Sequence, residues 1–156
     1  MQTILYKGKN DKVMYIMRGL PGSGKTTMAR TLSKYVYATD DFWMKDGEYV
    51  FNIERLKGAH RWNVNRVADV LKEGVSPVVV DNTNLEPRDI KPYLLLAMEY
   101  DYSVILAEPD TPWKHDVNVL VEKNTHYIGK EVMRKKLEQY RRDITLQDVL
   151  NADVNI

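Results

Sequence analysis

Short apolar runs alternate with longer amphipathic segments along this chain of 156 residues. Brief apolar runs bounded by polar or turn-forming residues are typical of strands that are buried in a sheet. The run that ends at Val80 is rich in valine, a residue that favours strands. The pattern therefore predicts strands at Val13–Met17, Pro77–Val80 and Val104–Ala107.

The segments between these runs place apolar residues at the spacing of an α-helix. One helical stripe, which Gly74 follows as a stop signal, contains Leu56, His60, Val64, Val67, Ala68 and Leu71. His60 is therefore expected to be a core histidine. Further helices are predicted at Lys25–Val36, Asn84–Glu99, Trp113–Lys123 and Lys130–Arg142. Because strands separated by helices indicate βαβ units, we expect an α/β fold with an open parallel sheet covered by helices on both faces.

The composition changes this picture mainly by exclusion. The chain has no cysteine, which rules out a disulfide scaffold, a cysteine nucleophile and a cysteine-ligated zinc site. Its net charge of +1 indicates no particular class of partner. It has neither an apolar run long enough to cross a membrane nor an apolar leader. We expect one domain over residues 1–156, intracellular, without a membrane partner and monomeric, although the composition leaves the oligomeric state open.

A glycine-rich stretch lies between the first predicted strand and the first predicted helix. It reads GLPGSGKT and fits the pattern G-x-x-x-x-G-K-[ST], whose backbone N–H groups cradle phosphate oxygens at a helix N-terminus. Lys25 is expected to reach the β- and γ-phosphates and Thr26 to offer its hydroxyl to Mg²⁺. The motif predicts that ATP or another nucleoside triphosphate binds here with Mg²⁺. The predicted phosphate-binding residues are Gly19, Leu20, Pro21, Gly22, Ser23, Gly24, Lys25, Thr26 and Thr27.

Two carboxylates supply candidate chemistry beside the phosphates. Asp81 follows the strand that ends at Val80, and the ligands of an open α/β sheet gather at the carboxyl ends of its strands, so Asp81 is predicted to hold Mg²⁺. Asp40 is predicted to accept the proton of an attacking hydroxyl, since phosphoryl transfer needs little more than one oriented carboxylate as base. Asp41 is expected instead to start a turn or cap a short helix, and Asn84 to cap the helix that follows.

Several sequence motifs together resemble the polynucleotide-kinase-type P-loop family. They run from about Tyr15 to Asp143 and read RGLPGSGKTTMARTL, TDDF, EYVFN, AHRWN, VVVDNTN, AEPDTPWKHDV and EKNTH. Within the family, the chain is similar to the kinase-like domain of the NEDD-binding protein group. It also resembles the P-loop domain of 2′,3′-cyclic-nucleotide phosphodiesterase.

The resemblance implies transfer of the γ-phosphate of ATP to a 5′-hydroxyl end of RNA or DNA, which makes a nucleic acid end the expected partner. It implies that Asp40 is the general base, that Lys25 and Thr26 contact the phosphates and Mg²⁺, and that Asp81 lies beside the metal and the acceptor. The segment after Asn124 would form a lid over the phosphates. Two hypotheses of other classes stay open: a small-molecule P-loop kinase, and a nucleotide-binding interaction module with little catalysis.

The expected lid differs from that of phage-type members of the family. Their lids are rich in arginine, whereas this one reads KNTHYIGK from Lys123 to Lys130. A lysine here or Arg134 must then stabilise the transition state, and lysine supplies charge without the bidentate fork of arginine. We expect Arg134 to be catalytic. Lys130, Arg134 and Arg141 are expected to share a helix face that contacts nucleic acid, the alternative being a solvated face.

The remaining acceptor candidates are aromatic or basic. Phe42 and Trp43 follow the proposed base and are candidates to stack a nucleotide base, with core packing as the alternative. Arg88 follows the DNTN motif and is a candidate contact for a substrate phosphate, the alternative being a surface ion pair with Glu86 or Asp89. The predicted acceptor site is completed by Asp40, Asp81 and Lys123.

Overall fold

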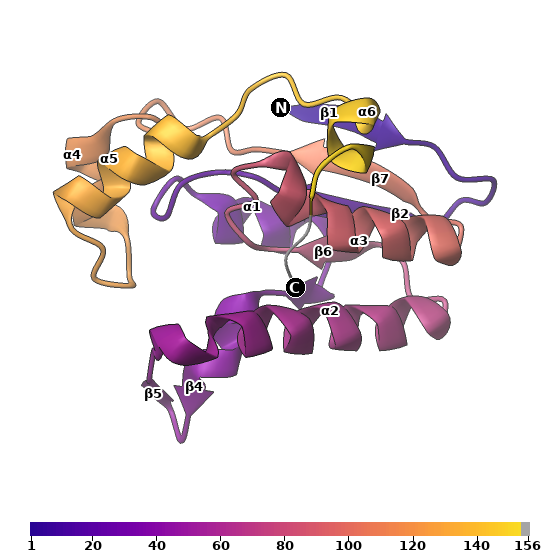
Figure 1. Cartoon of the computed structure of the whole chain (residues 1–156), viewed down its shortest axis with the longest axis horizontal. Helices are drawn as coiled ribbons and strands as arrows, with labels where there is room; N and C mark the ends of the chain where they lie inside the picture. The colour runs from indigo at the N-terminus through magenta and orange to yellow at the C-terminus, as the bar shows by residue number, and fades with distance from the viewer. Residues whose placement is uncertain (154–156) are drawn as a thin grey trace.

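The structure is a computed structural model that describes residues 1–153, so residues 154–156 of the predicted 1–156 domain lie outside the described part. One sheet in the order β1-β7-β2-β6-β3 runs through the centre of the molecule (Figure 1). Strands β2, β3, β6 and β7 are parallel, and β1 pairs antiparallel with β7 at one edge. These strands are β1 (Gln2–Tyr6), β2 (Val13–Met17), β3 (Val36–Tyr37), β6 (Val78–Val80) and β7 (Ser103–Ala107).

Helices flank both faces of this sheet. They are α1 (Lys25–Leu32), α2 (Leu56–Lys72), α3 (Pro87–Glu99), α4 (Val117–Lys123), α5 (Lys130–Gln139) and α6 (Leu146–Leu150). The chain between β3 and α2 forms short elements, namely the 3₁₀ helix η1 (Thr39–Trp43), the hairpin strands β4 (Met44–Lys45) and β5 (Glu48–Tyr49), and η2 (Ile53–Arg55). The mostly parallel sheet with helices on both faces confirms the predicted α/β class.

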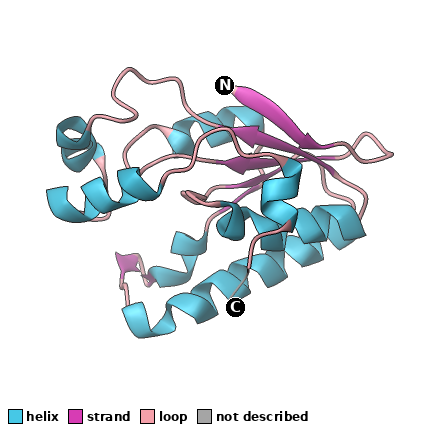
Figure 2. Cartoon of the chain, turned by 45° about the horizontal axis from the view of Figure 1, so that its top comes forward, coloured by secondary structure: helices cyan, strands magenta, loops and turns pink. Residues whose placement is uncertain are grey.

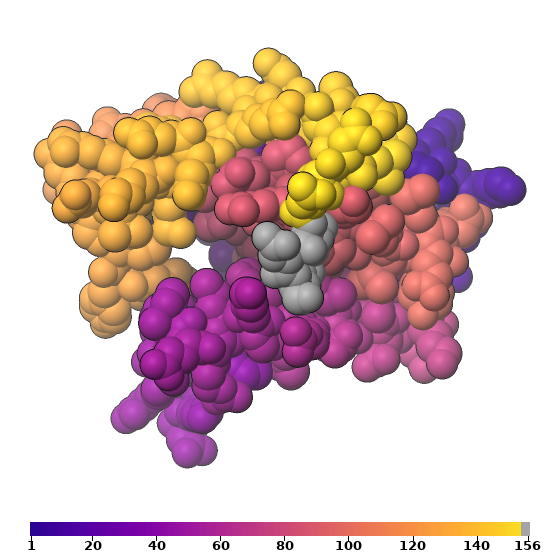
Figure 3. Space-filling model, viewed as in Figure 1, coloured from indigo at the N-terminus to yellow at the C-terminus, as the bar shows by residue number. Residues whose placement is uncertain are grey.

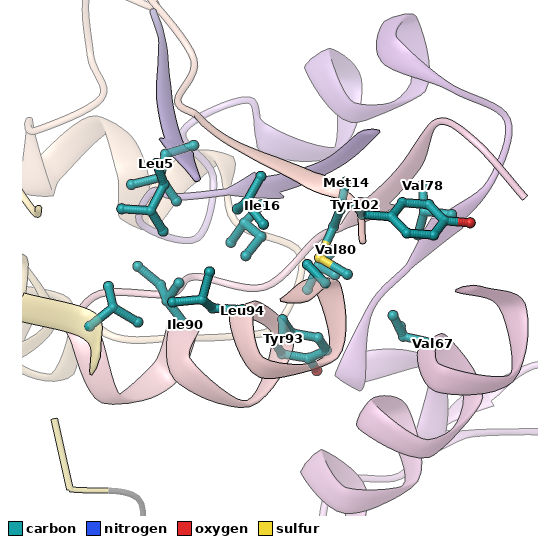
Figure 4. Close-up of a cluster of buried hydrophobic side chains, with 14 of the residues drawn as sticks. Leu5, Met14, Ile16, Val67, Val78, Val80, Ile90, Tyr93, Leu94 and Tyr102 are labelled. Atoms are coloured by element: carbon teal, nitrogen blue, oxygen red, sulfur yellow. The ribbon is translucent and has the colours of Figure 1, made fainter. Parts of the chain in front are cut away.

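Neighbouring residues of a strand pack against helices on opposite faces of the sheet. Ile16 of β2 lies in the larger core, which includes Ile90 of α3 and residues of α2 and α6 (Figure 4). The next residue, Met17, packs on the other face with Ala29 of α1. This alternation follows from the two-residue period of a strand. The loop that follows Met17 and the start of α1 therefore lie at the carboxyl end of β2.

Helices α4 and α5 form a unit beside the sheet (Figure 2). They pack on each other through Leu120 and Met133, and this cluster also contains Leu20 of the glycine-rich loop. The unit therefore packs against the predicted phosphate cradle. Among the described residues, no helix combines the length and the apolar character needed to span a bilayer.

Several predicted boundaries differ from the structure. The first helix ends at Leu32, because the backbone is extended at Ser33, and the last residue of the predicted helix belongs to β3. The predicted lid helices are also shorter, since α4 starts at Val117 and α5 ends at Gln139. Strand β1 was not predicted, because only one of its five residues, Leu5, is buried and the strand therefore lacks a clear apolar alternation.

Candidate active site

The loop between β2 and α1 has a backbone that requires glycine. Gly19, Gly22 and Gly24 have positive φ angles of 154°, 84° and 104°, a region that other residues rarely adopt. A Cβ at Gly19 would lie 2.7 Å from the Ser23 hydroxyl, and one at Gly22 would lie 2.9 Å from the backbone N of Asn124. The loop therefore has the conformation that lets backbone N–H groups surround a phosphate at the N-terminus of α1.

Lys25, Thr26 and Asp81 meet at the start of α1. Thr26 donates its hydroxyl hydrogen to Asp81 Oδ2 at 2.7 Å, while Asp81 Oδ1 is buried and has no hydrogen-bond partner in residues 1–153. Burial raises the pKa of Asp81, against the lowering effects of the Thr26 hydrogen bond and the Lys25 charge. Burial lowers the pKa of Lys25, against the raising effects of Asp81 and Asp40. Buried groups with shifted pKa values in a cleft are typical of a functional site.

The oxygens of Asp81 and Thr26 suit Mg²⁺. This cation takes oxygen ligands and usually binds through one or two carboxylates together with phosphates and water. No group of three or more His, Cys, Asp or Glu side chains that could hold a metal by itself occurs in the described residues. The donor set therefore fits a magnesium ion that binds together with a nucleotide.

Asp40 faces the phosphate cradle from η1. The Asn82 side chain accepts a hydrogen bond from the backbone N–H of Thr39 at 2.8 Å, which fixes this turn beside the end of β6. Asp41 forms an ion pair with Arg66 and so stabilises the turn, as expected from the sequence. Asp40 itself lines the same cleft as the glycine-rich loop.

This cleft brings the predicted site together from distant parts of the chain. Its volume is about 960 Å³, at the upper end of the range of ligand pockets. The glycine-rich loop and α1 contribute Lys25 and Thr26 to its lining, the strand ends contribute Asp81, and the loop between α4 and α5 contributes His126. Figure 3 shows the surface hollowed between the α4–α5 unit and the chain segment that carries the β4–β5 hairpin.

A family model described as an AAA domain matches residues 14–146, which include every residue that lines the cleft. The chain belongs to this AAA domain family. Its P-loop and its sheet make it a P-loop, kinase-like domain, which confirms the resemblance found in the sequence. The P-loop implies nucleotide binding.

This AAA domain is similar to parts of longer proteins. It is 38% identical over 147 residues to NEDD4-binding protein 2 of Homo sapiens, covering 91% of this chain and 8% of that protein. It is 29% identical over 126 residues to 2′,3′-cyclic-nucleotide 3′-phosphodiesterase of Mus musculus, covering 80% of this chain and 30% of that protein. A chain in the structure of the Pnkp1/Rnl/Hen1 RNA repair complex has the same fold, with a TM-score of 0.64 at 24% identity over 92% of this chain and 48% of that one. The AAA domain therefore spans less than half of each of these proteins.

Two aromatic residues of the predicted acceptor site lie outside the cleft. Trp43 is only 2% exposed and packs edge-to-face against Phe42 and Phe51. Phe42 is half-buried and contacts Trp62 as well. Of the two roles considered from the sequence, base stacking and core packing, the buried ring of Trp43 has core packing.

The predicted basic face of the last helical region is wrong. Helix α5 ends before Arg141, whose guanidinium forms an ion pair with Asp148 at 2.9 Å. Arg134 is exposed on α5 and does not line the cleft, so the structure does not bring it to the phosphate site. Lys123 does line the cleft, and its Nζ lies 4.2 Å from the centre of the Trp113 ring.

Arg88 lines a second, smaller cleft of about 320 Å³ and also lies 3.4 Å from Glu86, the ion-pair partner considered from the sequence. Asn82 and Thr83 line both clefts, so the two meet at the end of β6. His60 is exposed rather than buried in the core, and its ring lies 3.2 Å from the hydroxyl of the residue that begins η1. The lining of the second cleft includes Lys57, His60, Asn82, Thr83, Arg88 and Lys136.

Sequence reasoning did not find the partners of the side chain that joins the segment after α5 to the strand ends. Arg18 is 5% exposed and donates to the backbone carbonyls of Asn84, Leu85 and Arg141 at 2.8, 2.9 and 2.6 Å. Burial lowers its pKa, although nearby negative charge acts in the opposite direction. The prediction that Asn84 caps α3 is wrong, because the N-cap of α3 is Glu86. The Asn84 side chain instead donates to the carbonyl of Met17 at 2.7 Å. An arginine directly after an apolar strand was the available signal.

The AEPDTPW motif supports the glycine-rich loop from the side of β7. Thr111 donates its hydroxyl hydrogen to the carbonyl of Ser23 at 2.7 Å. The indole N–H of Trp113 donates to the carbonyl of Gly22 at 3.1 Å. These two hydrogen bonds support the phosphate cradle from outside. In the sequence, Thr111 and Trp113 stood out only as members of a family motif.

Proposed function

We propose that this AAA domain is an ATP-dependent polynucleotide 5′-hydroxyl kinase that uses Mg²⁺ and acts on an end of RNA or DNA. The observation that carries the proposal is that Asp40, Lys25 and Asp81 line one cleft. Nucleotide binding alone needs no carboxylate base opposite the phosphate cradle, whereas transfer to a hydroxyl does. The similarity to a cyclic-nucleotide phosphodiesterase and to a chain of an RNA repair complex supports a nucleic acid as the acceptor.

Five residues that line the cleft have stated roles in this reaction. Lys25 and the loop backbone hold the β- and γ-phosphates, while Thr26 and Asp81 would hold Mg²⁺, which neutralises phosphate charge when it is bound. Asp40 takes the proton of the acceptor hydroxyl as the hydroxyl oxygen bonds to the γ-phosphorus. The bond from that phosphorus to the bridging oxygen breaks, and its electron pair leaves with ADP. Lys123 supplies positive charge from the lid.

The second cleft favours a polynucleotide over a small acceptor. It meets the nucleotide cleft at Asn82, and its lining includes Lys57, Arg88 and Lys136. In our proposal, a strand with its 5′ end at Asp40 continues into this cleft, where the cations neutralise its phosphates. A sugar or nucleoside acceptor would leave the second cleft unused.

Label transfer tests this function. The protein is incubated with γ-labelled ATP, Mg²⁺ and RNA or DNA oligonucleotides of matched sequence that carry either a 5′-hydroxyl or a 5′-phosphate. We expect label only on the 5′-hydroxyl oligonucleotides. Asp40→Asn is the variant that should lose transfer. Asp46→Asn, at the exposed tip of the β4–β5 hairpin, is the matched control that should keep it.

Three other results would contradict the proposal. Thermal stabilisation by MgATP without label on any acceptor would indicate a nucleotide-binding interaction module. Label on small hydroxyl compounds alone would indicate a small-molecule kinase. Equal transfer by the parent and Asp40→Asn would show that Asp40 is not the base.

A further inference from the structure

His126, in the loop between α4 and α5, contacts the proposed base directly. Its Nε2 lies 3.2 Å from Asp40 Oδ2, and this nitrogen is the donor because an ionised carboxylate only accepts hydrogen bonds. The other ring nitrogen, Nδ1, is buried and has no partner in residues 1–153. The two side chains are 34% and 50% exposed. They therefore meet at the mouth of the cleft, where Asp40 is the hydrogen-bond partner of the imidazole.

The β4–β5 hairpin approaches the same pair through Tyr49. The Tyr49 hydroxyl lies 3.4 Å from Asp40 Oδ1, and the centre of its ring lies 4.9 Å from that of His126. Burial, and then the charge of Asp40, raise the pKa of Tyr49 to about 12, so its hydroxyl keeps its proton near neutral pH. A distance of 3.4 Å is long for a hydrogen bond to oxygen. Oδ1 is therefore the oxygen that an acceptor hydroxyl can take over, while Oδ2 stays with His126.

The loop that carries His126 is shaped by Asn124. The Asn124 Oδ1 accepts hydrogen bonds from the backbone N–H groups of His126 and Ile128 at 3.2 and 2.9 Å. Its amide donates to the carbonyl of Ile128 and to two carbonyls of α4. The backbone of Asn124 also lies against Gly22, which has no space for a side chain there. One residue thus connects the phosphate cradle to the loop that places His126.

We propose that His126 is a positioning residue for phosphotransfer. It holds Oδ2 of Asp40 so that Oδ1 faces the acceptor hydroxyl, and a correctly oriented base then exists only while the lid is closed. Small errors in the placement of reacting groups cost orders of magnitude in rate. His126 acts through Asp40 rather than on the phosphates, and this inference rests on the proposed kinase function.

Steady-state label transfer to a 5′-hydroxyl oligonucleotide separates positioning from binding. His126→Ala should lower kcat by about 10- to 100-fold, the effect of losing a hydrogen bond to a charged group. The KM for ATP and the thermal shift with MgATP should not change. His126→Gln keeps an N–H donor and should recover most of the rate. Tyr127→Asn is the matched control, because the side chain of Tyr127, next to His126, is 94% exposed. Asparagine also tolerates the positive φ of 58° at this position.

The same substitution in an Asp40→Asn background distinguishes positioning from an independent role. If His126 acts through Asp40, His126→Ala should have no further effect on the residual rate of Asp40→Asn. Parental kcat in His126→Ala, or an equal fold loss in both backgrounds, would overturn this inference while leaving the kinase function intact. A parent protein that binds MgATP but transfers no label would overturn the kinase function, and the role of His126 with it.

Discussion

The two sides of the cleft are built in different ways. The phosphate side is a run of consecutive residues, 19–26, whose glycine conformations and half-buried lysine belong to one local motif. The base side is formed by Asp40, Tyr49 and His126, which come from η1, the hairpin and the α4–α5 loop and are partly exposed. Nucleotide binding therefore depends on local sequence, whereas phosphotransfer depends on whether η1, the hairpin and the lid keep their relative positions. Substitutions should separate the two properties.

The largest effect is expected on the phosphate side. Lys25→Ala removes the cation of the cradle, so both MgATP binding and label transfer should be lost. At a ligand concentration of about 100 Kd, the parent should gain about 2.7 kcal/mol, or roughly 5–11 °C in Tm, and the variant should gain nothing. The control is Lys72→Ala, in the exposed last turn of α2. An unchanged thermal shift in Lys25→Ala would show that the cradle is assigned wrongly.

On the base side, Asp40→Asn should cut label transfer by about 10²–10⁴-fold, the contribution of a general base. ATP affinity, measured by calorimetry, should stay within a few-fold of the parent, because the phosphate side is intact. Lys25→Ala should lose both ATP binding and label transfer, whereas Asp40→Asn should lose only transfer, so this pair of variants separates the two sides of the cleft most clearly. Parallel losses of ATP affinity and rate would instead make Asp40 a metal ligand or a folding residue.

Asp81→Asn should stabilise the nucleotide-free protein while removing the Mg²⁺-dependent part of its stabilisation by ATP. Burial raises the pKa of Asp81, so its ionised form disfavours folding, and stability falls as the pH rises through that pKa. We expect a gain of about 1 kcal/mol near neutral pH. The gain should vanish below about pH 4, where the carboxyl is protonated in both states. Chemical denaturation across this pH range tests it, and a less stable variant at pH 7 would contradict it.

The smallest effect concerns two cations of the same helix. Lys136 lines the second cleft and Arg134 does not. If the acceptor strand occupies that cleft, Lys136→Gln should weaken binding of a single-stranded oligonucleotide a few-fold and reduce the log–log salt slope by about 0.7. Arg134→Gln should change neither quantity, and fluorescence anisotropy at several salt concentrations measures both. The reverse order of effects would place the acceptor on the outer face of α5.

The sequence by itself determined the central strands β2, β6 and β7, the helices that follow β2 and β6, and the phosphate cradle. These features depend on short-range rules: apolar periodicity selects strand or helix, and glycine at Gly19, Gly22 and Gly24 permits positive φ. It also indicated Asp40 and Asp81, because each follows a recognisable strand or motif. The proposed role of His126 had no such local signal. Arg18 follows an apolar strand, but the sequence did not indicate which carbonyls it contacts.

Only the tertiary structure decided what surrounds the base. Whether Trp43 is buried, whether Arg134 reaches the cleft and which side chain holds Asp40 all depend on contacts between segments far apart in the chain. Hydrophobic spacing indicates which side of an element is apolar, but not which other segment packs against it. The lid helix is an example, because its early end at Gln139 removes Arg141 from the basic face that an uninterrupted helical period predicts. Side-chain partners at long range are selected by packing, which local periodicity does not encode.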